Sequence, residues 1–414
     1  MYDLHLNAEQ IEFRDTVRDF VEKEVKPVAL HPDRLQETGP RMLAEQLVQA
    51  ARMGLRTLAL SEELGGAGAD NLTSCIVMGE LAVGDVGIAV TLAQTSALAH
   101  ILFDEMMTSA QRDRFLPQFL ADDSYHLAFA AYAPEADTEW CYHRPSVTET
   151  GGKTNATRES TGDWVINGAA KLVANAPLAK LIAVQAQTDA QALGTSGVRN
   201  FLVPRDSAGL TARESDDEPA WYHGTRGTLI FKDCRVPEKN ILAGETAALR
   251  AGTRSMKGAA LQLDAINLGM GRAAYEAALA YAKLRVQGGF PIIQHEGVGM
   301  LLADMAVRLE AGRNMIWQAA WAADHPDAQA DRSLPDLPLA ILANVFVSEI
   351  AHEVAVKASE VFGAMGILRD MPLHKHVHDA LIFFHAGNGN CAAKLQVAEL
   401  LDDYQRPSIQ TGTE

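Results

Sequence analysis

Apolar residues recur at intervals of three to four along the first 124 residues, which predicts amphipathic helices. Asn7 and Gln10 have the spacing of a capping box at the start of the first helix. Pro27 is expected to end that helix, because proline cannot continue the hydrogen-bond ladder. A second helix is expected over about 41–53, with Gly54 just after its end. The apolar stripe of the first helix consists of Phe13, Val17, Phe20, Val21 and Val25.

From about residue 126 to residue 236 the pattern changes to short apolar runs bounded by turn residues. Gly151-Gly152, Gly162-Asp163 and Pro204 separate these runs. The pattern is typical of an antiparallel β domain. The expected strands are His126–Ala130, Trp164–Ile166, Leu181–Val184, Asn200–Val203 and Thr228–Phe231.

The helical period returns after about Gly244 and continues in long alanine-rich segments. Four long helices in sequence favour an antiparallel bundle. The predicted fold class is therefore α+β, with an N-terminal all-α domain at 1–124, a central antiparallel β domain at 125–243 and a C-terminal four-helix bundle at 244–414. The bundle helices are expected near 256–287, 298–324, 337–361 and 376–403.

Composition and charge narrow the classes of function. The 414 residues are too many for one hydrophobic core, and the 48% hydrophobic content needs no metal or disulfide for folding. The net charge of −17 makes nucleic-acid binding improbable. The N-terminus lacks the apolar core of a signal peptide, and the segment 337–347 is too short to span a bilayer. We therefore expect a cytoplasmic protein without membrane insertion, whose four well-separated cysteines are free thiols.

Several short motifs occur in order and at consistent spacing along the chain. They are 60–70 (LSEELGGAGAD), 108–122 (TSAQRDRFLPQFLAD), 231–237 (FKDCRVP), 269–274 (GMGRAA), 362–366 (FGAMG) and 372–375 (PLHK). Together they resemble the motifs of the acyl-CoA dehydrogenase family. The segment 60–70 is similar to the family's glycine-rich turn P-E-E-x-G-G-x-G-x-D. No strand clearly precedes it, so a tight turn between helices is favoured over a phosphate loop.

The resemblance implies a reaction and a cofactor. In this family a base removes the α-proton of an acyl-CoA thioester, and FAD takes a hydride from the β-carbon to give the enoyl-CoA. A base is needed because the α-C–H is a poor acid, and hydrogen bonds to the thioester oxygen are needed because charge develops there. An apolar pocket excludes water from flavin and substrate.

The sequence departs from the family at the base. One usual glutamate position, before the last helix, falls on Ala386 or Gly387 here. The alternative position on the first bundle helix is Ala259. None of these side chains can accept a proton, so the resemblance leaves the base unassigned.

The resemblance also identifies candidate cofactor contacts, some of which are substituted relative to the family. Thr138 retains a hydroxyl at a serine position, and Arg285 retains the guanidinium expected near the flavin pyrophosphate of a partner subunit. Leu172, Val173 and Ala174 replace the family's W-I-T beside the isoalloxazine. The remaining candidates are Phe129, Ala131, Tyr132, Glu360, Gly363, Gly366 and Asn388.

Two ionisable residues are candidates for a displaced base. His385 adjoins the vacant position, and a histidine can take a proton near neutral pH; it is otherwise a helix-start or packing residue. Asp264 stands in an apolar stretch of the first bundle helix, where burial would raise its pKa; it is otherwise a hydrogen-bonded helix residue or a subunit contact. His374, His376 and His378 have a spacing that could suggest a metal site, but the resemblance places them on a structural segment, so no metal is expected.

Three functions remain open from the sequence. The first is flavin-dependent α,β-dehydrogenation of an acyl-CoA with an unusual or displaced base. The second is a catalytically silent subunit of a mixed acyl-CoA dehydrogenase oligomer. The third is a non-dehydrogenase reaction on the same fold. The expected partners are an acyl-CoA substrate and either further copies of this chain, as a dimer or tetramer, or a related subunit.

Overall fold

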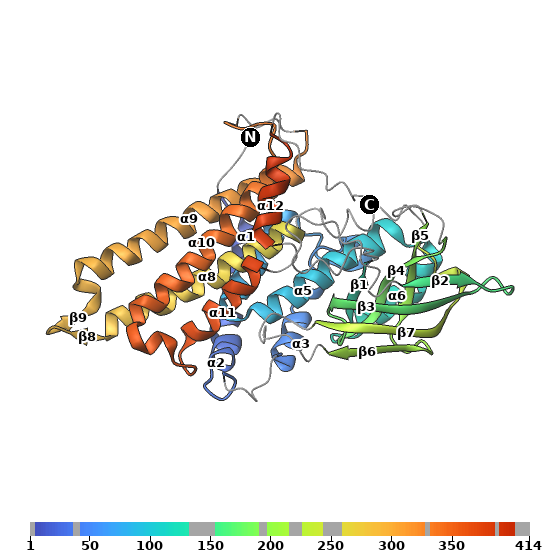
Figure 1. Cartoon of the computed structure of the whole chain (residues 1–414), viewed down its shortest axis with the longest axis horizontal. Helices are drawn as coiled ribbons and strands as arrows, with labels where there is room; N and C mark the ends of the chain where they lie inside the picture. The colour runs from blue at the N-terminus through green and yellow to red at the C-terminus, as the bar shows by residue number, and fades with distance from the viewer. Residues whose placement is uncertain are drawn as a thin grey trace, which may run out of the picture.

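The computed structural model describes residues 5–35, 42–131, 154–189, 197–214, 226–242, 259–327, 332–385 and 389–401, without the side chains of Leu172, Ala259, Gly389 and Ala392. A helical N-terminal part, a β-sheet part and a helical C-terminal part follow one another along the chain, as expected. The β sheet lies at one end of the molecule, the long C-terminal helices extend to the other, and the N-terminal helices lie between and beside them (Figure 1).

The first helix keeps its predicted start but continues beyond its predicted end. Asn7 and Gln10 form both hydrogen bonds of the capping box at the start of α1 (Ala8–Phe20). A π-helical turn (Val21–Val25) and α2 (Lys26–Ala29) follow directly. The expectation that Pro27 ends the helix was therefore wrong. Pro27 occupies the first turn of α2, where the missing N–H removes no hydrogen bond within that helix.

The other N-terminal helices are α3 (Ala44–Arg52), α4 (Asn71–Gly84), α5 (Val86–Ala99) with a π-helical extension (His100–Met106), and α6 (Ser109–Ala121). Gly54 follows α3 in the left-handed conformation at φ +85°, as its position predicts. The glycine-rich segment 60–70 forms the tight turn before α4. Its Gly66 has no room for a side chain, since a Cβ would lie 2.1 Å from the Leu60 carbonyl oxygen.

The sheet contains β1 (His126–Ala130), β2 (Asn155–Arg158), β3 (Trp164–Ala174), β4 (Ala179–Gln187), β5 (Val198–Pro204), β6 (Leu210–Glu214) and β7 (Arg226–Val236). Its order is β1-β4-β2-β3-β7-β6, with β5 also paired to β4. The predicted antiparallel pairing holds for β2–β3, β3–β7, β4–β5 and β6–β7. It fails for β1, which runs parallel to β4, and for the single β2–β4 pair. The sheet is thus mixed, because β1 enters from the N-terminal helices without a hairpin to its neighbour.

The C-terminal helices are α8 (Ala259–Leu284), α9 (Glu296–Asp324), α10 (Leu339–Phe362), α11 (Pro372–His385) and α12 (Gly389–Ala398). The fourth helix expected at 376–403 is therefore divided into α11 and α12. A small hairpin of β8 (Val286–Gln287) and β9 (Phe290–Pro291) joins α8 to α9 at the far end of the bundle (Figure 1).

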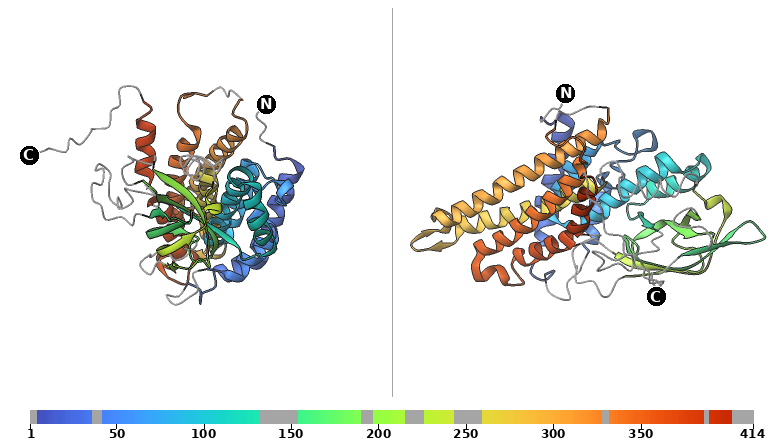
Figure 2. Two further views of the ribbon diagram at one scale, coloured as in Figure 1. Left: turned by 90° about the vertical axis from the view of Figure 1, so that its right-hand side faces the viewer. Right: turned by 45° about the horizontal axis from the view of Figure 1, so that its top comes forward.

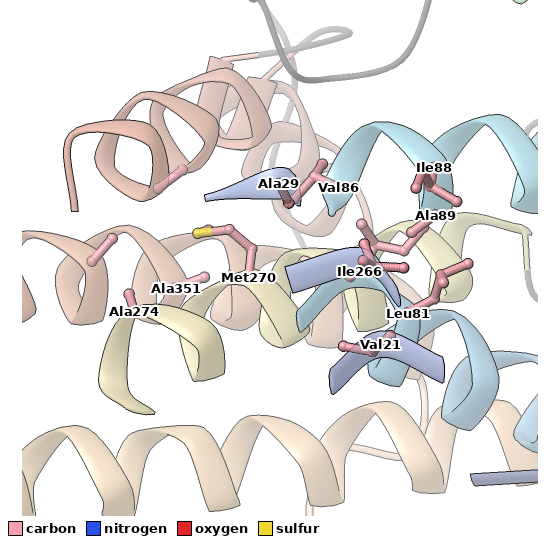
Figure 3. Close-up of a cluster of buried hydrophobic side chains, with 14 of the residues drawn as sticks. Val21, Ala29, Leu81, Val86, Ile88, Ala89, Ile266, Met270, Ala274 and Ala351 are labelled. Carbon is pink, nitrogen blue, oxygen red and sulfur yellow. The ribbon is translucent and has the colours of Figure 1, made fainter. Parts of the chain in front are cut away.

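One large hydrophobic core joins the two helical parts. It includes Val21 near α1, Leu81 of α4, Ile88 of α5, Met270 of α8 and Ala351 of α10 (Figure 3). The α4–α8 contact is close, because Gly269 lies against the backbone of Gly79. Figure 2 shows the sheet packed beside α5 and α6, away from the bundle end. Two helices, Val86–Met106 and Leu339–Ile367, are long and apolar enough to cross a membrane, a test that core helices of globular proteins also pass.

Candidate functional site

The described candidate contacts of the flavin ring lie on or directly after two strands of the sheet, β1 and β3. Phe129 lies in β1 and is half-buried, and Ala131 follows that strand and is exposed. Val173 is buried and Ala174 half-buried at the end of β3. The end of β3 is linked to the start of β1, since the Asn175 side chain after β3 donates a hydrogen bond to the Leu127 carbonyl of β1 at 3.4 Å.

A β-bulge shapes β3 at the predicted ring contacts. Ala170 pairs with Leu229 of β7, whereas Val173 pairs with Gly227, so two residues of β3 face one residue of β7. A bulge leaves backbone groups out of the ladder and changes the direction of the strand, and such bulges are frequent beside active sites. Ala174, at the end of β3 beyond this bulge, has a small, half-buried side chain.

Sequence reasoning missed the polar cluster that holds this end of the sheet. Asn175 adopts φ +60°, and its amide also donates to the Thr91 carbonyl and to Thr95 Oγ1 of α5 at 3.1 and 3.2 Å. His126 Nδ1 lies 3.1 Å from the same Thr95 hydroxyl. Burial, together with the charge of Arg56, lowers the pKa of His126 to about 4, so its ring is neutral at physiological pH. The sequence signal that could have identified Asn175 is its position in a turn before Pro177, since asparagine tolerates the left-handed conformation.

A second group of candidate contacts lies at the far end of the bundle. Arg285 and Glu360 are exposed, and Gly363 and Gly366 belong to the 3-10 turn after α10. The ends of α8 and α10 are adjacent, because the rings of Tyr281 and Phe362 stack with centroids 4.1 Å apart. Gly363 has φ +57°, and a Cβ on Gly366 would lie 2.5 Å from the Ser359 carbonyl oxygen. Glycine is therefore required in this turn.

The two groups of candidate contacts lie at opposite ends of the molecule (Figure 1). The β8–β9 hairpin, which directly follows Arg285, points away from the β sheet in Figure 1 and in the right-hand view of Figure 2. A single chain thus does not bring Phe129, Val173 and Arg285 together around one cofactor.

Apolar side chains are exposed at the same far end of the bundle. Leu284, beside Arg285, is 81% exposed, and Ile367 after α10 is 76% exposed. Met300 and Val307 on α9 are each 69% exposed. A group of large exposed apolar residues is typical of a surface that is covered by another protein.

Asp264 points into the helical bundle. Its carboxylate Oδ1 accepts a hydrogen bond from Asn344 Nδ2 of α10 at 2.6 Å, whereas its Oδ2 has no partner among the described residues. Burial raises the pKa of Asp264 to about 8, against the smaller opposing effect of the Asn344 hydrogen bond. It lies five residues along α8 from Ala259, which is about 1.4 turns of helix.

His385 is the last residue of α11 and is exposed. It lies beside Phe384, whose ring packs at 5.3 Å from His352 of α10. Burial lowers the pKa of His352, and the charge of His385 adds to that shift. The side chain of Ala259 and all of Tyr132, Thr138, Ala386, Gly387 and Asn388 lie outside the described residues.

The three histidines near 376 do not converge on a metal position. The rings of His374 and His378 pack against each other with centroids 4.6 Å apart. His376 is buried, and burial beside the charged Lys375 lowers its pKa to about 3. Within the described part of the chain, no group of three potential ligands could hold a metal ion.

Known proteins resemble this chain along nearly its whole length. Models of the acyl-CoA dehydrogenase N-terminal, middle and C-terminal domains match residues 7–123, 147–234 and 250–401. The mitochondrial short-chain specific acyl-CoA dehydrogenase of Homo sapiens is 30% identical over 370 residues, which are 89% of this chain and 84% of that protein. The short-chain specific acyl-CoA dehydrogenase of Megasphaera elsdenii is 28% identical over 383 residues, 92% of this chain and 94% of that protein.

Solved structures of acyl-CoA dehydrogenases also superpose on this chain along nearly its whole length. The butyryl-CoA dehydrogenase of Megasphaera elsdenii superposes with a TM-score of 0.80 at 26% identity, covering 96% of this chain and 98% of that one. The glutaryl-CoA dehydrogenase of Mycobacterium smegmatis gives the same TM-score and identity, covering 96% of each chain. The chain belongs to the acyl-CoA dehydrogenase family, a family of FAD-dependent oxidoreductases.

Proposed function

We propose that this chain uses FAD to oxidise the Cα–Cβ bond of an acyl-CoA thioester, within an oligomer of identical subunits. When bound, FAD supplies the acceptor for the hydride that leaves the β-carbon. The observation that carries the proposal is the location of the candidate contacts at two ends of the molecule. The protein also matches acyl-CoA dehydrogenases over all three domains.

The residues at the sheet end would hold the flavin ring. The bulge of β3 offers main-chain groups, and the small Ala131 and Ala174 leave room for a flat ring. Asn175, bonded to both α5 and β1, fixes the end of β3 on which these contacts depend. A rigid cradle of this kind keeps reacting atoms in position and water out.

The far end of the bundle would complete the site of a neighbouring subunit. Arg285 is exposed there, and a guanidinium can bind a pyrophosphate through several hydrogen bonds. The exposed Leu284, Met300, Val307 and Ile367 would be buried by the same association. A second copy therefore explains both the exposed arginine and the exposed apolar residues at this end of the bundle.

We infer that His385 is the displaced base. It ends α11 immediately before Ala386 and Gly387, where the resemblance places the missing carboxylate. Asp264 is less suitable, because its carboxylate accepts a hydrogen bond from Asn344 inside the bundle and it lies more than one helical turn along α8 from Ala259. A catalytically silent subunit is the second candidate function, favoured by the absence of a carboxylate at residues 259, 386 and 387.

The visible spectrum of the purified chain tests the proposal. We expect flavin absorption near one equivalent per subunit, bleached by addition of butyryl-CoA. A colourless protein that acquires flavin only when a related subunit is co-expressed would instead establish the silent-subunit function.

A matched pair of variants tests the oligomer. Ile367→Asp places a charge in the exposed apolar surface at the far end of the bundle, and should yield smaller particles in light scattering with reduced flavin content. Leu334→Asp changes a residue that is 58% exposed in the loop between α9 and α10, and should alter neither property. Equal behaviour of the two variants would contradict the assignment of that surface.

A further inference from the structure

Solvent reaches the central helix α5 at a single residue, Gln94. Every other residue of α5 is buried, whereas Gln94 is half-buried. On one side α5 packs into the large core that it shares with α8, where Ala89 and Ile266 lie (Figure 3). On another side the hydroxyl of Thr95 accepts the hydrogen bond from Asn175 of the β-sheet part. Gln94 is thus an accessible polar residue on a helix that is otherwise enclosed between the sheet and the bundle.

Two side-chain oxygen atoms on this part of α5 lack hydrogen-bond partners. The amide oxygen Oε1 of Gln94 and the hydroxyl oxygen Oγ1 of Thr91 are both covered, and neither has a partner among the described residues. Thr91 itself is fully buried. Positions three residues apart lie on the same face of a helix. Because a buried polar atom without a hydrogen bond costs free energy, this pair of oxygens suits a ligand that can bond to both.

The same turn of α5 adjoins the strand end that carries candidate contacts of the flavin ring. Asn175 directly follows Ala174 of β3, and its amide donates a hydrogen bond to the Thr91 carbonyl at 3.1 Å. Gln94 lies three residues farther along α5, which is about 4.5 Å along the helix axis. An acyl chain whose Cα–Cβ bond lies beside a flavin ring at Ala174 would therefore extend towards these two oxygens.

The surroundings of the two oxygens favour a neutral polar group. No residue of α5 is charged, and the ring of His126, which lies 3.1 Å from the Thr95 hydroxyl, is neutral because burial lowers its pKa to about 4. A ligand hydroxyl can donate to the Gln94 amide oxygen and accept from the Thr91 hydroxyl, so one group satisfies both atoms. A methyl group can do neither. A carboxylate only accepts, and it would leave the amide oxygen without a donor.

We propose that the acyl group oxidised by this protein carries a hydroxyl group beyond its β-carbon, which Gln94 and Thr91 bind. The inference rests on the proposed dehydrogenation, since that reaction places the acyl chain beside the flavin ring and hence beside α5. Gln94 and Thr91 are therefore specificity-determining residues, distinct from the base and from the cofactor contacts. A site whose buried polar groups are completed by a substrate hydroxyl discriminates strongly against an analogue that lacks it.

Calorimetric titration of the holoenzyme with CoA thioethers tests the inference without turnover. A thioether has no carbonyl to acidify the α-proton, so it can bind without being oxidised. In a series of chain lengths, each ω-hydroxyalkyl thioether is compared with the alkyl thioether in which a methyl group replaces the hydroxyl. At the chain length that reaches α5, the hydroxyl compound should bind at least about tenfold more tightly.

The same titrations separate the two ways in which the inference can fail. Equal or weaker binding of the hydroxyl compound at every chain length would overturn the proposed specificity and leave the dehydrogenation standing. Tighter binding of an ω-carboxyalkyl thioether than of the hydroxyl compound would also overturn it. If no CoA thioether binds, the proposed function fails together with the inference.

Variants locate the hydroxyl group. Gln94→Met and Thr91→Val replace the polar atoms by apolar groups of similar shape, and each should reduce the preference for the hydroxyl compound to about twofold or less. Gln318→Met changes a half-buried glutamine of α9 and should keep the preference of the parent. Melting temperature and flavin content are checked first for each variant. A preference that survives in both Gln94→Met and Thr91→Val would show that the hydroxyl group binds elsewhere and would refute the assignment.

Discussion

Asp264 of α8 is joined to Asn344 of α10 by a hydrogen bond of 2.6 Å, and its second carboxylate oxygen has no partner among the described residues. The pair lies inside the helical bundle, with Cys75 of α4 near enough to respond to the Asp264 charge. A carboxyl group in this position is more stable protonated than ionised, which has a measurable consequence for folding.

The stability of the protein should depend on pH through Asp264. In the unfolded chain the group ionises near pH 3.8, whereas in the folded chain its pKa is about 8. Between these values the folded state holds a proton that the unfolded state releases, so the free energy of unfolding falls as pH rises. Asp264→Asn should remove this contribution and unfold at a higher temperature than the parent at pH 8, but not at pH 4. Asp327→Asn, an exposed change of equal charge, should show no such difference in calorimetry.

Replacement of His385 should affect turnover rather than stability. His385→Gln should lower kcat by about 10²–10⁴-fold with little change in KM, as expected when a general base is lost. Asp264→Asn, assayed in parallel, should retain turnover within about twofold of the parent. If only Asp264→Asn loses activity, Asp264 rather than His385 is the base.

The close crossing of α4 and α8 should tolerate no side chain at Gly269. A Cβ there would lie 2.2 Å from the Gly79 carbonyl oxygen, so Gly269→Ala must separate the two helices. We expect a loss of about 1–3 kcal/mol or more in urea unfolding. Gly297→Ala, in the first turn of α9, meets nothing within 4 Å and should be neutral or stabilising.

Lys375 should be essential for stability because of the carboxylates around it. Its Nζ lies 2.6 Å from Asp379 and 3.7 Å from Asp85, and Asp85 also accepts a hydrogen bond from Arg34 at 2.7 Å. All four groups are buried, so Lys375→Met leaves negative charge uncompensated and should cost about 3–5 kcal/mol. Lys394→Met breaks an exposed pair with Glu349 and should cost about 1 kcal/mol or less. Similar losses for both lysines would contradict this reading.

The sequence predicted local structure well where a residue's neighbours along the chain determine it. Asn7 with Gln10 and Gly54 are such cases, as is β1, whose predicted limits match the structure. Pro27 was misjudged because a π-helical turn, which has no clear sequence signal, lets the chain begin a new helix at the proline. The parallel pairing of β1 with β4 depends on a partner some fifty residues away, which periodicity cannot reveal.

In the candidate site, too, the sequence identified residues by local motifs but not the contacts between distant segments. The resemblance identified residues by motif, but Asn175 and His126 emerged only when α5, β1 and β3 were seen together. The surroundings of the Asp264 side chain likewise became known only when α10 was placed beside α8. The sequence of a helix does not by itself define which of its faces meets the substrate.

The pairing of β1 with β4 also constrains how the protein is synthesised. The ribosome releases β1 well before β4, so the backbone hydrogen-bonding groups of β1 stay unpaired while the intervening chain is translated. Its apolar residues, Leu127 among them, are exposed to chaperones or to other nascent chains during that interval. Assembly of the sheet is therefore the step at which slow translation or a shortage of chaperones should most reduce the yield of folded protein.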